Sequence, residues 1–359
     1  MVCNRKNSME PAPRVSIIIL NWNGWEDTIE CLESVYQITY PNYDVIVVDN
    51  GSENDSLDKI REYCHGKIVV KSGFFEYQND NKPIEIFEYD REEIESKSPL
   101  KDDIQSWPSN KRLILIKNTA NEGFTEGNNV AMRFILNKLD SRYILLLNND
   151  TVVDRLFLKE LIKIGESNQN IGFMGPKIYF YNFNGKSNVF QFAGAKQNTW
   201  IFNPKHIGWK EQDKGQYNKN SEVDYIHGSC VLAKVMMIKQ IGLLDKDFFS
   251  YREENDWGIR GLKKGWKSVY AFRSKIWHKG GGSTKNENGR SIATYYLVRN
   301  NFMFIKKHAR KIQQVVYLCY FFSIEFWYHM GIILIYKKDL KNSRIYLRGI
   351  RDGIKILIT

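Results

Sequence analysis

Three short runs of aliphatic and β-branched residues, each followed by asparagine or aspartate, constrain the fold of this chain more than any other feature. They span residues 15–20, 43–48 and 143–147. A helical pattern separates the first two, and the alternation resumes at residues 113–117 and at a helix expected from about 125 to 139. Strand, helix and strand with polar residues after each strand indicate βαβ units, and hence an α/β fold with a mostly parallel central sheet and flanking helices.

The polar clusters that follow these runs predict a ligand site. They are Asn21 and Asn23 after the first run, Asp49 and Asn50 after the second, and Asn148, Asn149 and Asp150 after the third. In open α/β sheets, ligands bind in the crevice beyond the carboxyl ends of the strands. Each cluster alone could form an ordinary turn, because Asn, Asp and Gly favour turns for local reasons. Three clusters in one sheet favour a site.

Composition and motifs exclude several classes of protein. The 359 residues, 43% hydrophobic and 26% charged, are typical of a globular protein. No GxGxxG follows a strand and no GxxxxGK[ST] occurs, which disfavours a Rossmann dehydrogenase and a P-loop enzyme. Five scattered cysteines without a CxxC pair favour a reducing compartment, and residues 1–14 lack the apolar segment of a secretion signal, so we expect a cytoplasmic protein.

The net charge of +11 is concentrated near the C-terminus. Residues 299–359 contain 12 Lys and Arg against three acids, so +9 of the +11 lies there. The main body has neither a basic stripe nor a recognised nucleic-acid-binding motif, and we expect no nucleic-acid partner. A second charged segment is acidic: residues 67–111 read as an inserted subdomain or a long excursion at the sheet edge, although a solvated acidic surface explains its charge equally well.

Four stretches together resemble glycosyltransferase family 2, the inverting enzymes with the GT-A fold, and most closely its rhamnosyltransferase-like branch. They are VSIIILNWNG with VIVVDNGSEND; NTANEGFTEGNN; YILLLNNDTVV; and HGSCVLAKVMMIKQIGLLDKDFFSYREENDWGIRGLKKGWK followed by WHKGGGS. The resemblance implies a catalytic domain at residues 14–305, preceded by a flexible N-terminus at 1–13 and followed by a basic, apolar helical extension at 306–359.

The resemblance implies a nucleotide-binding set. Asp49 matches the acid that binds the imide of a pyrimidine base, and Asn21 and Asn23 would line the same pocket; alone, Asp49 could simply cap a turn. The remaining members of this set are Asn50, Asn121, Gly123, Asn128, Asn148 and Asn149. Residues 121–128 lie at a predicted helix N-terminus, where free amides favour anions, although Asn128 could equally belong to plain helix capping.

Asp150 and His278 are the metal ligands that the resemblance implies, with Mn²⁺ or Mg²⁺ bridging the donor diphosphate. Asn148 replaces the first acid of the usual DxD motif, which lowers the charge at the site. A lone histidine after a tryptophan is more often structural. The glycines at 280–282 favour the functional interpretation, because such a loop can close over a diphosphate.

Three acids, Glu253, Glu254 and Asp256, open a helical pattern after FFSY. The helix dipole stabilises negative charge there, which by itself supports a structural role. The stretch matches the family's motif of two acids, whose second acid is the catalytic base, here Glu254. Such a base removes the acceptor's hydroxyl proton as that oxygen attacks the anomeric carbon.

The resemblance therefore implies a metal-dependent inverting glycosyltransferase that moves a sugar from a UDP-, dTDP- or GDP-sugar to a hydroxyl of a glycan or lipid-linked glycan. A nucleotidyltransferase-like enzyme would need a basic, glycine-rich loop near the N-terminus, which NWNG is not. A non-catalytic sugar-binding relative would be expected to lose Glu254 and His278, and both are present.

Residues 312–336 are apolar over a length that could span a membrane, but Glu325 interrupts them, and basic residues flank both sides. The density of aromatic residues suits a membrane interface. We expect peripheral attachment to the inner face of the cell membrane, with the alternative that these helices simply pack on the catalytic domain.

Overall fold

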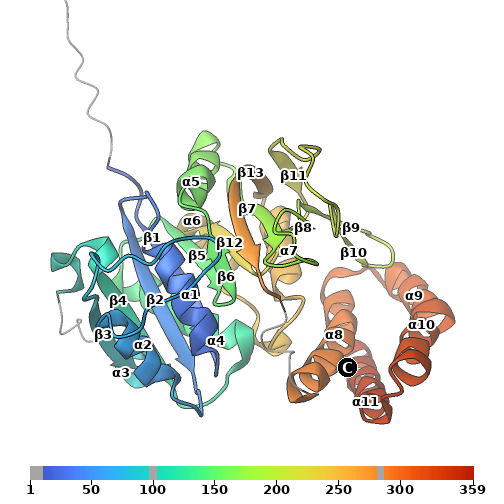
Figure 1. Cartoon of the computed structure of the whole chain (residues 1–359). Helices are drawn as coiled ribbons and strands as arrows, with labels where there is room; N and C mark the ends of the chain where they lie inside the picture. The colour runs from blue at the N-terminus through green and yellow to red at the C-terminus, as the bar shows by residue number, and fades with distance from the viewer. Residues whose placement is uncertain (1–10, 97–102, 281–286) are drawn as a thin grey trace, which may run out of the picture.

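The computed structural model describes residues 11–96, 103–280 and 287–359, and Figure 1 shows a sheet with helices on both faces and a group of helices beyond one edge. The strands are β1 Val15–Asn21, β2 Tyr43–Asn50, β3 Glu85–Asp90, β4 Arg112–Asn118, β5 Tyr143–Asn148, β6 Thr151–Val153, β7 Ile171–Phe180, β8 Phe190–Phe192, β9 Ala195–Gln197, β10 Pro204–His206, β11 Ser221–Val223, β12 Cys230–Lys234 and β13 Lys267–His278. The helices are α1 Trp25–Val35, α2 Ser56–Cys64, α3 Arg91–Glu95, α4 Gly123–Lys138, α5 Phe157–Ser167, α6 Val235–Ile241, α7 Glu253–Lys263, α8 Glu287–His308, α9 Lys311–Tyr320, α10 Phe326–Gly331 and α11 Leu340–Ile358.

The main sheet has the order β11-β13-β7-β12-β5-β1-β2-β4-β3, with β6 on β13 and β8 on β7. Strands β5, β1, β2, β4 and β3 run parallel, which confirms the βαβ units expected from the sequence. The expectation of a mostly parallel sheet fails in the other half: β12 is antiparallel to β5 and β7, and β6, β8 and β11 also pair antiparallel. The sheet is therefore mixed, although β13 and β7 run parallel to each other within this half.

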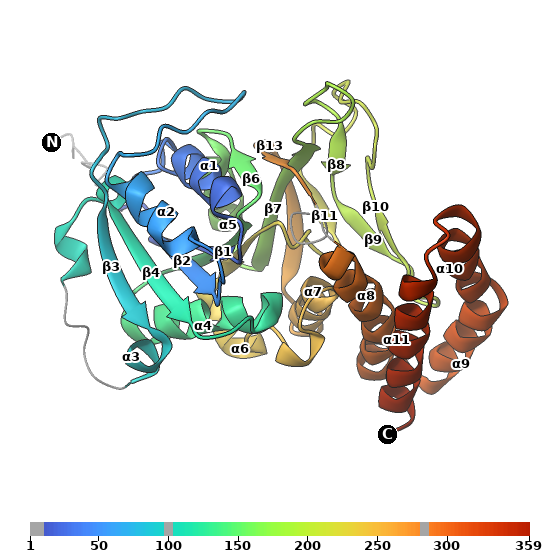
Figure 2. The ribbon, with the colours of Figure 1, turned by 60° about the horizontal axis from the view of Figure 1, so that its bottom comes forward.

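Alternation along β1 divides the core between the two faces of the sheet (Figure 2). Ile17 and Ile19 pack with α1, α2 and α5 on one face, whereas Ile18 packs with α4, α6 and α7 on the other. All three are fully buried. Strand residues point alternately to opposite faces, so a strand covered by helices on both sides is apolar along most of its length.

The acidic segment at 67–111 contributes to the sheet itself. Within it, β3 pairs in parallel with β4 and forms the edge strand. Tyr89 and Ile94 are buried in the same core cluster as α4. The interpretation as an excursion at the sheet edge therefore matches the structure of the described residues, and a separate subdomain does not.

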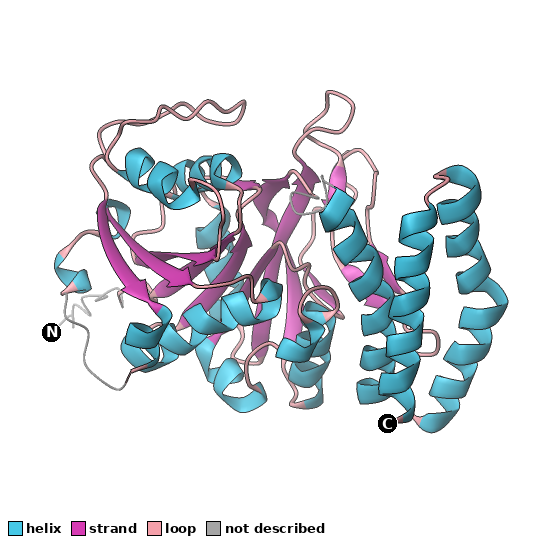
Figure 3. Ribbon diagram, turned by 90° about the horizontal axis from the view of Figure 1, so that it is seen from below, coloured by secondary structure: helices cyan, strands magenta, loops and turns pink. Residues whose placement is uncertain are grey.

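Helices α8 to α11 gather beyond the β11 edge (Figures 1 and 3). The segments α9, η5 Phe321–Glu325, α10 and η6 Ile332–Tyr336 form one continuous helix, Lys311–Tyr336. Phe302 of α8 shares an apolar cluster with Tyr317 and with Ile350 of α11. The boundary expected at 305/306 falls inside α8, which packs with the C-terminal helices.

Buried ion pairs hold the amino ends of the strands together. The side chain of Asp44 on β2 is fully buried and accepts hydrogen bonds from Arg14 at 2.7 Å and from Arg112 at 2.6 Å. Two guanidinium groups that are almost completely withdrawn from water thus depend on one carboxylate. Losing one member of such a group leaves uncompensated charge in the interior.

We expect Asp44→Asn to lower the free energy of unfolding by about 3 kcal/mol, measured by urea denaturation. Asp58→Asn is the matched control: Asp58 pairs with Arg61 at 2.8 Å, but its side chain is 74% exposed. Exposed pairs are worth little, so this variant should lose less than about 0.5 kcal/mol. Equal losses in the two variants would contradict the role of burial.

Candidate functional site

The carboxyl ends of β1 and β2 are joined by a buried hydrogen-bond network. Asn21 Nδ2 donates to Asp49 Oδ1 at 2.7 Å, and Thr28 Oγ1 donates to Asn21 Oδ1 at 2.8 Å. The backbone N–H and hydroxyl of Ser52 donate to the same carboxylate. A carboxylate accepts about four hydrogen bonds, so Asp49 retains capacity for one more donor.

Asn23 joins the loops that follow these two strands. Its backbone N–H donates to Ser52 Oγ at 2.9 Å, and its side-chain oxygen accepts from the backbone of Glu53 at 2.8 Å. Its φ of +53° lies in the left-handed region, which asparagine tolerates better than most residues. The two clusters expected after β1 and β2 therefore form one wall.

Asn50 connects β2 to the start of α4. Its Nδ2 donates to Asn121 Oδ1 at 3.0 Å and to the carbonyl of Gly123 at 3.2 Å. Gly123 has a φ of +76°, and a Cβ there would lie 2.6 Å from Phe249, so only glycine fits. The expected helix N-terminus is present, since α4 begins at Gly123.

The amides at this N-terminus are not open for an anion as expected. The N–H of Gly123 donates to Asn121 Oδ1 at 2.9 Å, and that of Thr125 donates to the carbonyl of Phe249 at 3.1 Å. Asn128 Nδ2 donates to the carbonyl of Phe124 at 2.7 Å, within its own helix. This corner thus ties α4 to the loop before α7, and the backbone there already has protein partners.

The residues of the third cluster, after β5, contact two different parts of the protein: Asn149 contacts α1, and Asp150 contacts β13. Asn149 Nδ2 donates to Thr28 Oγ1 at 3.0 Å, toward α1. Asn148 donates its backbone N–H to the carbonyl of Ser229 at 2.9 Å. Asp150 is 5% exposed, and its Oδ1 lies 3.1 Å from Nε2 of His278.

The pairing of β6 with β13 brings Asp150 and His278 together, because Thr151 lies opposite His278 in the register. Nδ1 of His278 lies 2.7 Å from Oε1 of Gln191, an atom that can only accept, so Nδ1 carries the proton. Nε2, the other ring nitrogen, faces the carboxylate of Asp150. Two acceptors this close repel unless a proton or a cation lies between them.

This donor set fits a divalent cation. A metal-binding histidine commonly donates its other N–H to a neighbouring acceptor, as His278 does to Gln191. Among the described residues, no group of three or more His, Cys, Asp or Glu side chains could hold a metal by itself. A pair of ligands suits Mg²⁺ or Mn²⁺, which take their remaining ligands from water and substrate phosphates.

Two further histidines lie next to the Asp150–His278 pair, one after the other. The rings of His278 and His227 are 5.8 Å apart, and those of His227 and His206 are 5.4 Å apart. Burial, followed by the charges of His206 and His278, holds the pKa of His227 well below its usual value. Its Nδ1 accepts from the backbone N–H of Ser229 at 3.1 Å, so His227 is a neutral, oriented ring.

The backbone before α7 is strained. Phe249, Tyr251 and Arg252 have φ values of +61°, +72° and +76°, although none is a glycine. Such conformations cost about 1–3 kcal/mol each and concentrate at functional sites. They place Glu253, the first residue of α7, beside the loop that contains Gly228.

The acids of α7 lie in different environments. Burial, reinforced by Glu254, raises the pKa of Glu253 well above its usual value. Burial also raises the pKa of Glu254, and the charge of Arg252 opposes this shift. A Cβ on Gly228 would be in ordinary van der Waals contact with both carboxyl groups, so these acids lie close to the residue that follows His227. Glu254 also lines a pocket of about 450 Å³.

Comparison with known proteins shows which family and which relatives this chain is similar to. The family model described as Glycosyl transferase family 2 matches residues 16–75. The low-salt glycan biosynthesis hexosyltransferase Agl10 of Haloferax volcanii is 24% identical over 255 residues, which cover 70% of this chain and 79% of that protein. The N-acetylglucosaminyl-diphospho-decaprenol L-rhamnosyltransferase of Mycobacterium tuberculosis is 30% identical over 83 residues, 23% of this chain and 26% of that protein.

The chain is a glycosyltransferase, and its residues 16–75 match the model of family 2. Solved structures show its fold to be GT-A. TarS 1–349 of S. aureus has a TM-score of 0.51 at 13% identity and covers 96% of this chain and 81% of that one. The mannosyltransferase PcManGT of Pyrobaculum calidifontis, solved with GDP-Man and Mn²⁺, has a TM-score of 0.52 at 12% identity and covers 96% and 87%.

Asp256 of this glycosyltransferase does not line the pocket that Glu254 lines. Although burial alone would raise its pKa, hydrogen bonding to His308 and the charge of Arg260 lower it overall. Arg260 Nε donates to Asp256 Oδ2 at 2.7 Å, and His308 Nε2 lies 2.8 Å from Oδ1. Residues two apart on a helix point about 200° apart, so Asp256 faces α8.

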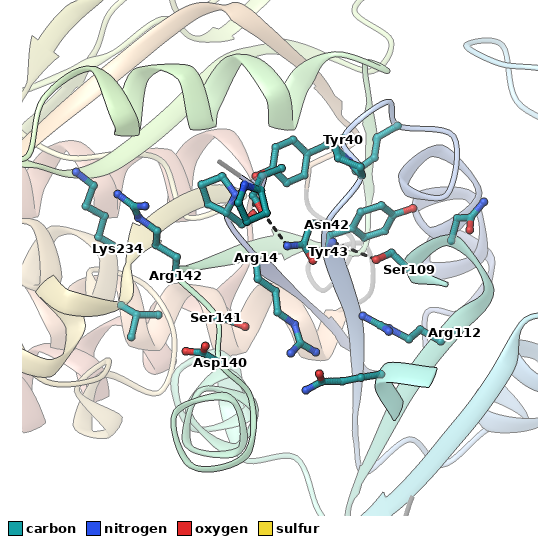
Figure 4. A pocket seen from close by; sticks show the side chains of 18 of the residues that line it. Arg14, Tyr40, Asn42, Tyr43, Ser109, Arg112, Asp140, Ser141, Arg142 and Lys234 are labelled. Carbon is teal, nitrogen blue, oxygen red and sulfur yellow. Dashed lines mark hydrogen bonds between the residues drawn. The ribbon is translucent and has the colours of Figure 1, made fainter. Parts of the chain in front are cut away.

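Another pocket of the glycosyltransferase lies elsewhere, at the amino ends of β1, β2 and β5 (Figure 4). Its volume is about 1640 Å³. Its cations are already engaged: Arg14 and Arg112 bind Asp44, and Lys234 donates to the carbonyl of Asn168 at 3.0 Å. It is remote from the carboxyl-end clusters and carries none of the predicted site residues.

Sequence reasoning missed His206, His227 and Gln191. His227 stands within the quoted HGSC stretch, so its position directly before β12 was a usable signal. His206 and Gln191 lie on short strands with no motif of their own. Of the glycine loop expected to close over a diphosphate, Gly281 and Gly282 lie outside the described residues.

Proposed function

We propose that this glycosyltransferase is a metal-dependent inverting enzyme that moves a sugar from a nucleotide-sugar donor to an acceptor hydroxyl in one displacement. The observation that carries the proposal is Glu254: a carboxylate of raised pKa that lines a pocket at the strained start of α7. Gly228 lies close to the Glu254 carboxyl and follows His227 in the chain. The ring of His227 lies 5.8 Å from that of His278, which pairs with Asp150.

In this proposal the β1–β2 wall binds the donor nucleotide. Asp49 has capacity for one N–H of a base, and Asn21 and Asn23 hold the surrounding backbone in place. Asn50, Asn121, Gly123, Asn128 and Asn149 support this wall through hydrogen bonds within the protein. Asn148 is the last residue of β5, which pairs with β1 of the wall, and it precedes Asp150 by two residues.

Asp150 and His278 would hold Mn²⁺ or Mg²⁺, which when bound supplies positive charge to the leaving diphosphate. Gln191 orients His278 for this task by fixing its tautomer. Glu254 accepts the proton of the acceptor hydroxyl as that oxygen attacks the anomeric carbon. A base poised near neutral pH is effective for this, and burial moves Glu254 in that direction.

The related proteins support the substrate classes. PcManGT was solved with GDP-Man and Mn²⁺, and GalNAc-T7 with UDP, GalNAc and Mn²⁺. We propose a UDP-, dTDP- or GDP-sugar as donor. The names of the two sequence relatives refer to glycan biosynthesis and to a lipid-linked diphosphate acceptor, and we propose a glycan or lipid-linked glycan as acceptor.

We further propose that the catalytic domain begins at about residue 14 and ends before α8, and that the C-terminal helices hold it peripherally on the inner face of the cell membrane. Among the described residues, one helix, Lys311–Tyr336, is long and apolar enough to cross a membrane, a property that core helices share. Only 6% of its most apolar stretch is buried. Trp327 and Ile324 are 67% and 57% exposed.

We expect Glu254→Gln to lower kcat by about 10²–10⁴-fold while leaving the affinity for nucleotide and Mn²⁺ nearly unchanged, because only the proton acceptor is lost. The measurement is transfer or donor hydrolysis with a panel of UDP-, dTDP- and GDP-sugars. Glu253→Gln is the matched control. Because Glu253, unlike Glu254, does not line the pocket, its replacement should cause a far smaller loss. The reverse ranking would show that Glu253 is the base.

We expect Asp150→Ala and His278→Ala each to weaken Mn²⁺ binding at least about 10-fold, measured by electron paramagnetic resonance with UDP or GDP present. The physical reason is that each removes one of two protein ligands. His65→Ala, at an exposed position after α2, should bind like the wild type. Full activity in EDTA would contradict the metal requirement.

We expect the full-length protein to float with anionic liposomes at low salt, because exposed aromatic residues and basic flanks favour an anionic interface. The double variant Ile324→Ser, Trp327→Ser should float several-fold less. Trp107→Ser, which changes a 41% exposed tryptophan near the opposite edge of the sheet, should not change flotation. Wild-type protein that stays at the bottom would contradict membrane attachment.

A further inference from the structure

The pocket that Glu254 lines is built jointly by the catalytic domain and the C-terminal helices. Its volume is about 450 Å³. Arg252 and Glu254 of the α7 region contribute one side, Leu297 of α8 and Ile332 of the apolar helix contribute another, and Tyr346 of α11 closes it. Residues from four separate elements therefore converge next to the proposed base.

The apolar helix has two different faces. Tyr317, Phe321, Glu325 and His329 are spaced four residues apart, so they lie along one stripe. Tyr317 and Phe321 are buried, and the side chain of Glu325 is only 19% exposed and lines the pocket. The acid that interrupts the apolar run thus faces the catalytic domain.

Glu325 is held among groups of the pocket rather than in the apolar surface. Its carboxylate lies 4.0 Å from Nε2 of His329. Burial raises its pKa, and the charge of Arg252 opposes the shift. The guanidinium of Arg252 donates from Nε to Asn301 Oδ1 at 2.7 Å and from Nη2 to the carbonyl of Phe202 at 3.1 Å.

Three polar atoms of the pocket's residues have no hydrogen-bond partner within the described part of the chain. They are the hydroxyl of Tyr346, a residue only 5% exposed, Nη1 of Arg252 and Nδ2 of Asn255. A buried polar group without a partner costs free energy, so folded proteins rarely keep one without a reason. A bound ligand would supply the missing acceptor and donor.

We infer that this pocket is the acceptor site, completed by the C-terminal helices, and that it takes a sugar ring carrying an apolar chain. The inference rests on the proposed function. Arg252, Tyr346 and Glu325 provide both donors and acceptors for ring hydroxyls, and the volume is within the range of small-ligand sites. The aliphatic wall of Leu297 and Ile332 suits the chain.

The geometry also explains how one helix serves two purposes. Its outer face presents Ile324 and Trp327 to the surroundings, and its inner face presents Glu325 to the acceptor. Ile335, 78% exposed, lies just beyond the pocket residue Ile332 along the chain. A chain leaving the pocket along this wall would enter the same apolar surface that attaches the protein to lipid.

The test is calorimetric titration of the full-length protein with octyl glucoside, galactoside, N-acetylglucosaminide and rhamnoside below their micelle concentrations, and with the matching methyl glycosides. We expect at least one octyl glycoside to bind with 1:1 stoichiometry and its methyl counterpart to bind more weakly. Tyr346→Phe should weaken this binding about 3- to 10-fold, and Glu325→Gln about 10-fold or more.

Tyr328→Phe is the matched control, since it removes the same kind of hydroxyl from a residue of the apolar helix that is 65% exposed. It should bind the octyl glycoside like the wild type. Binding that Tyr346→Phe and Glu325→Gln both retain would place the ligand on the outer face and overturn the inference, as would no binding at all. Equal affinity for methyl and octyl glycosides would exclude the apolar chain.

A parallel titration with UDP or GDP and Mn²⁺ separates this inference from the proposed function. Nucleotide binding without glycoside binding would overturn only the acceptor site. Absence of both would overturn the proposed function itself.

Discussion

The site depends on one long-range pairing, that of β13 with β6 and β7 near the β11 edge of the sheet. This pairing places His278 against Asp150, although 128 positions separate them along the chain. In the chain, β13 is followed by α8 and the C-terminal helices, so the same strand links them to the sheet whose first half binds the nucleotide in our proposal. Without β13 in this register, the acceptors of Asp150 and His278 would not face each other, and the cation that we propose between them would have no pair of ligands.

The two halves of the sheet divide the proposed chemistry. The parallel half ends in asparagine and aspartate side chains that bind one another, as Asn21 does with Asp49. This internal bonding preorganises the wall and leaves limited capacity for a ligand, which favours a few well-placed contacts. The mixed half contributes the strained turn before α7, where the raised pKa of Glu254 and its place in a pocket coincide. Strain of this kind persists only where surrounding contacts hold it, and Arg252 has such contacts with Asn301 and Phe202.

The arrangement of the C-terminal helices explains why a glutamate lies within an apolar run. A glutamate within an apolar run is costly in lipid, and yet the run is long and exposed. In the fold, Glu325 faces the pocket near Glu254, whereas Ile324 and Trp327 face outward. The helix is therefore amphipathic in a way that the composition of the run does not reveal. α8 connects this arrangement to the catalytic domain, since His308 binds Asp256 of α7.

The sequence by itself determined the βαβ half, the polar clusters after β1, β2 and β5, and the acids at the start of α7. These features are local: side-chain periodicity and turn chemistry act between residues near in the chain. Only the tertiary structure decided the antiparallel strands, the inclusion of β3 in the sheet and the set of His206, His227 and Gln191 around His278. It also decided that Asp256 faces Arg260 and His308, and that Glu325 faces inward. Such choices depend on which distant elements pack against each face, and neither the period of a helix nor the length of a strand contains that information.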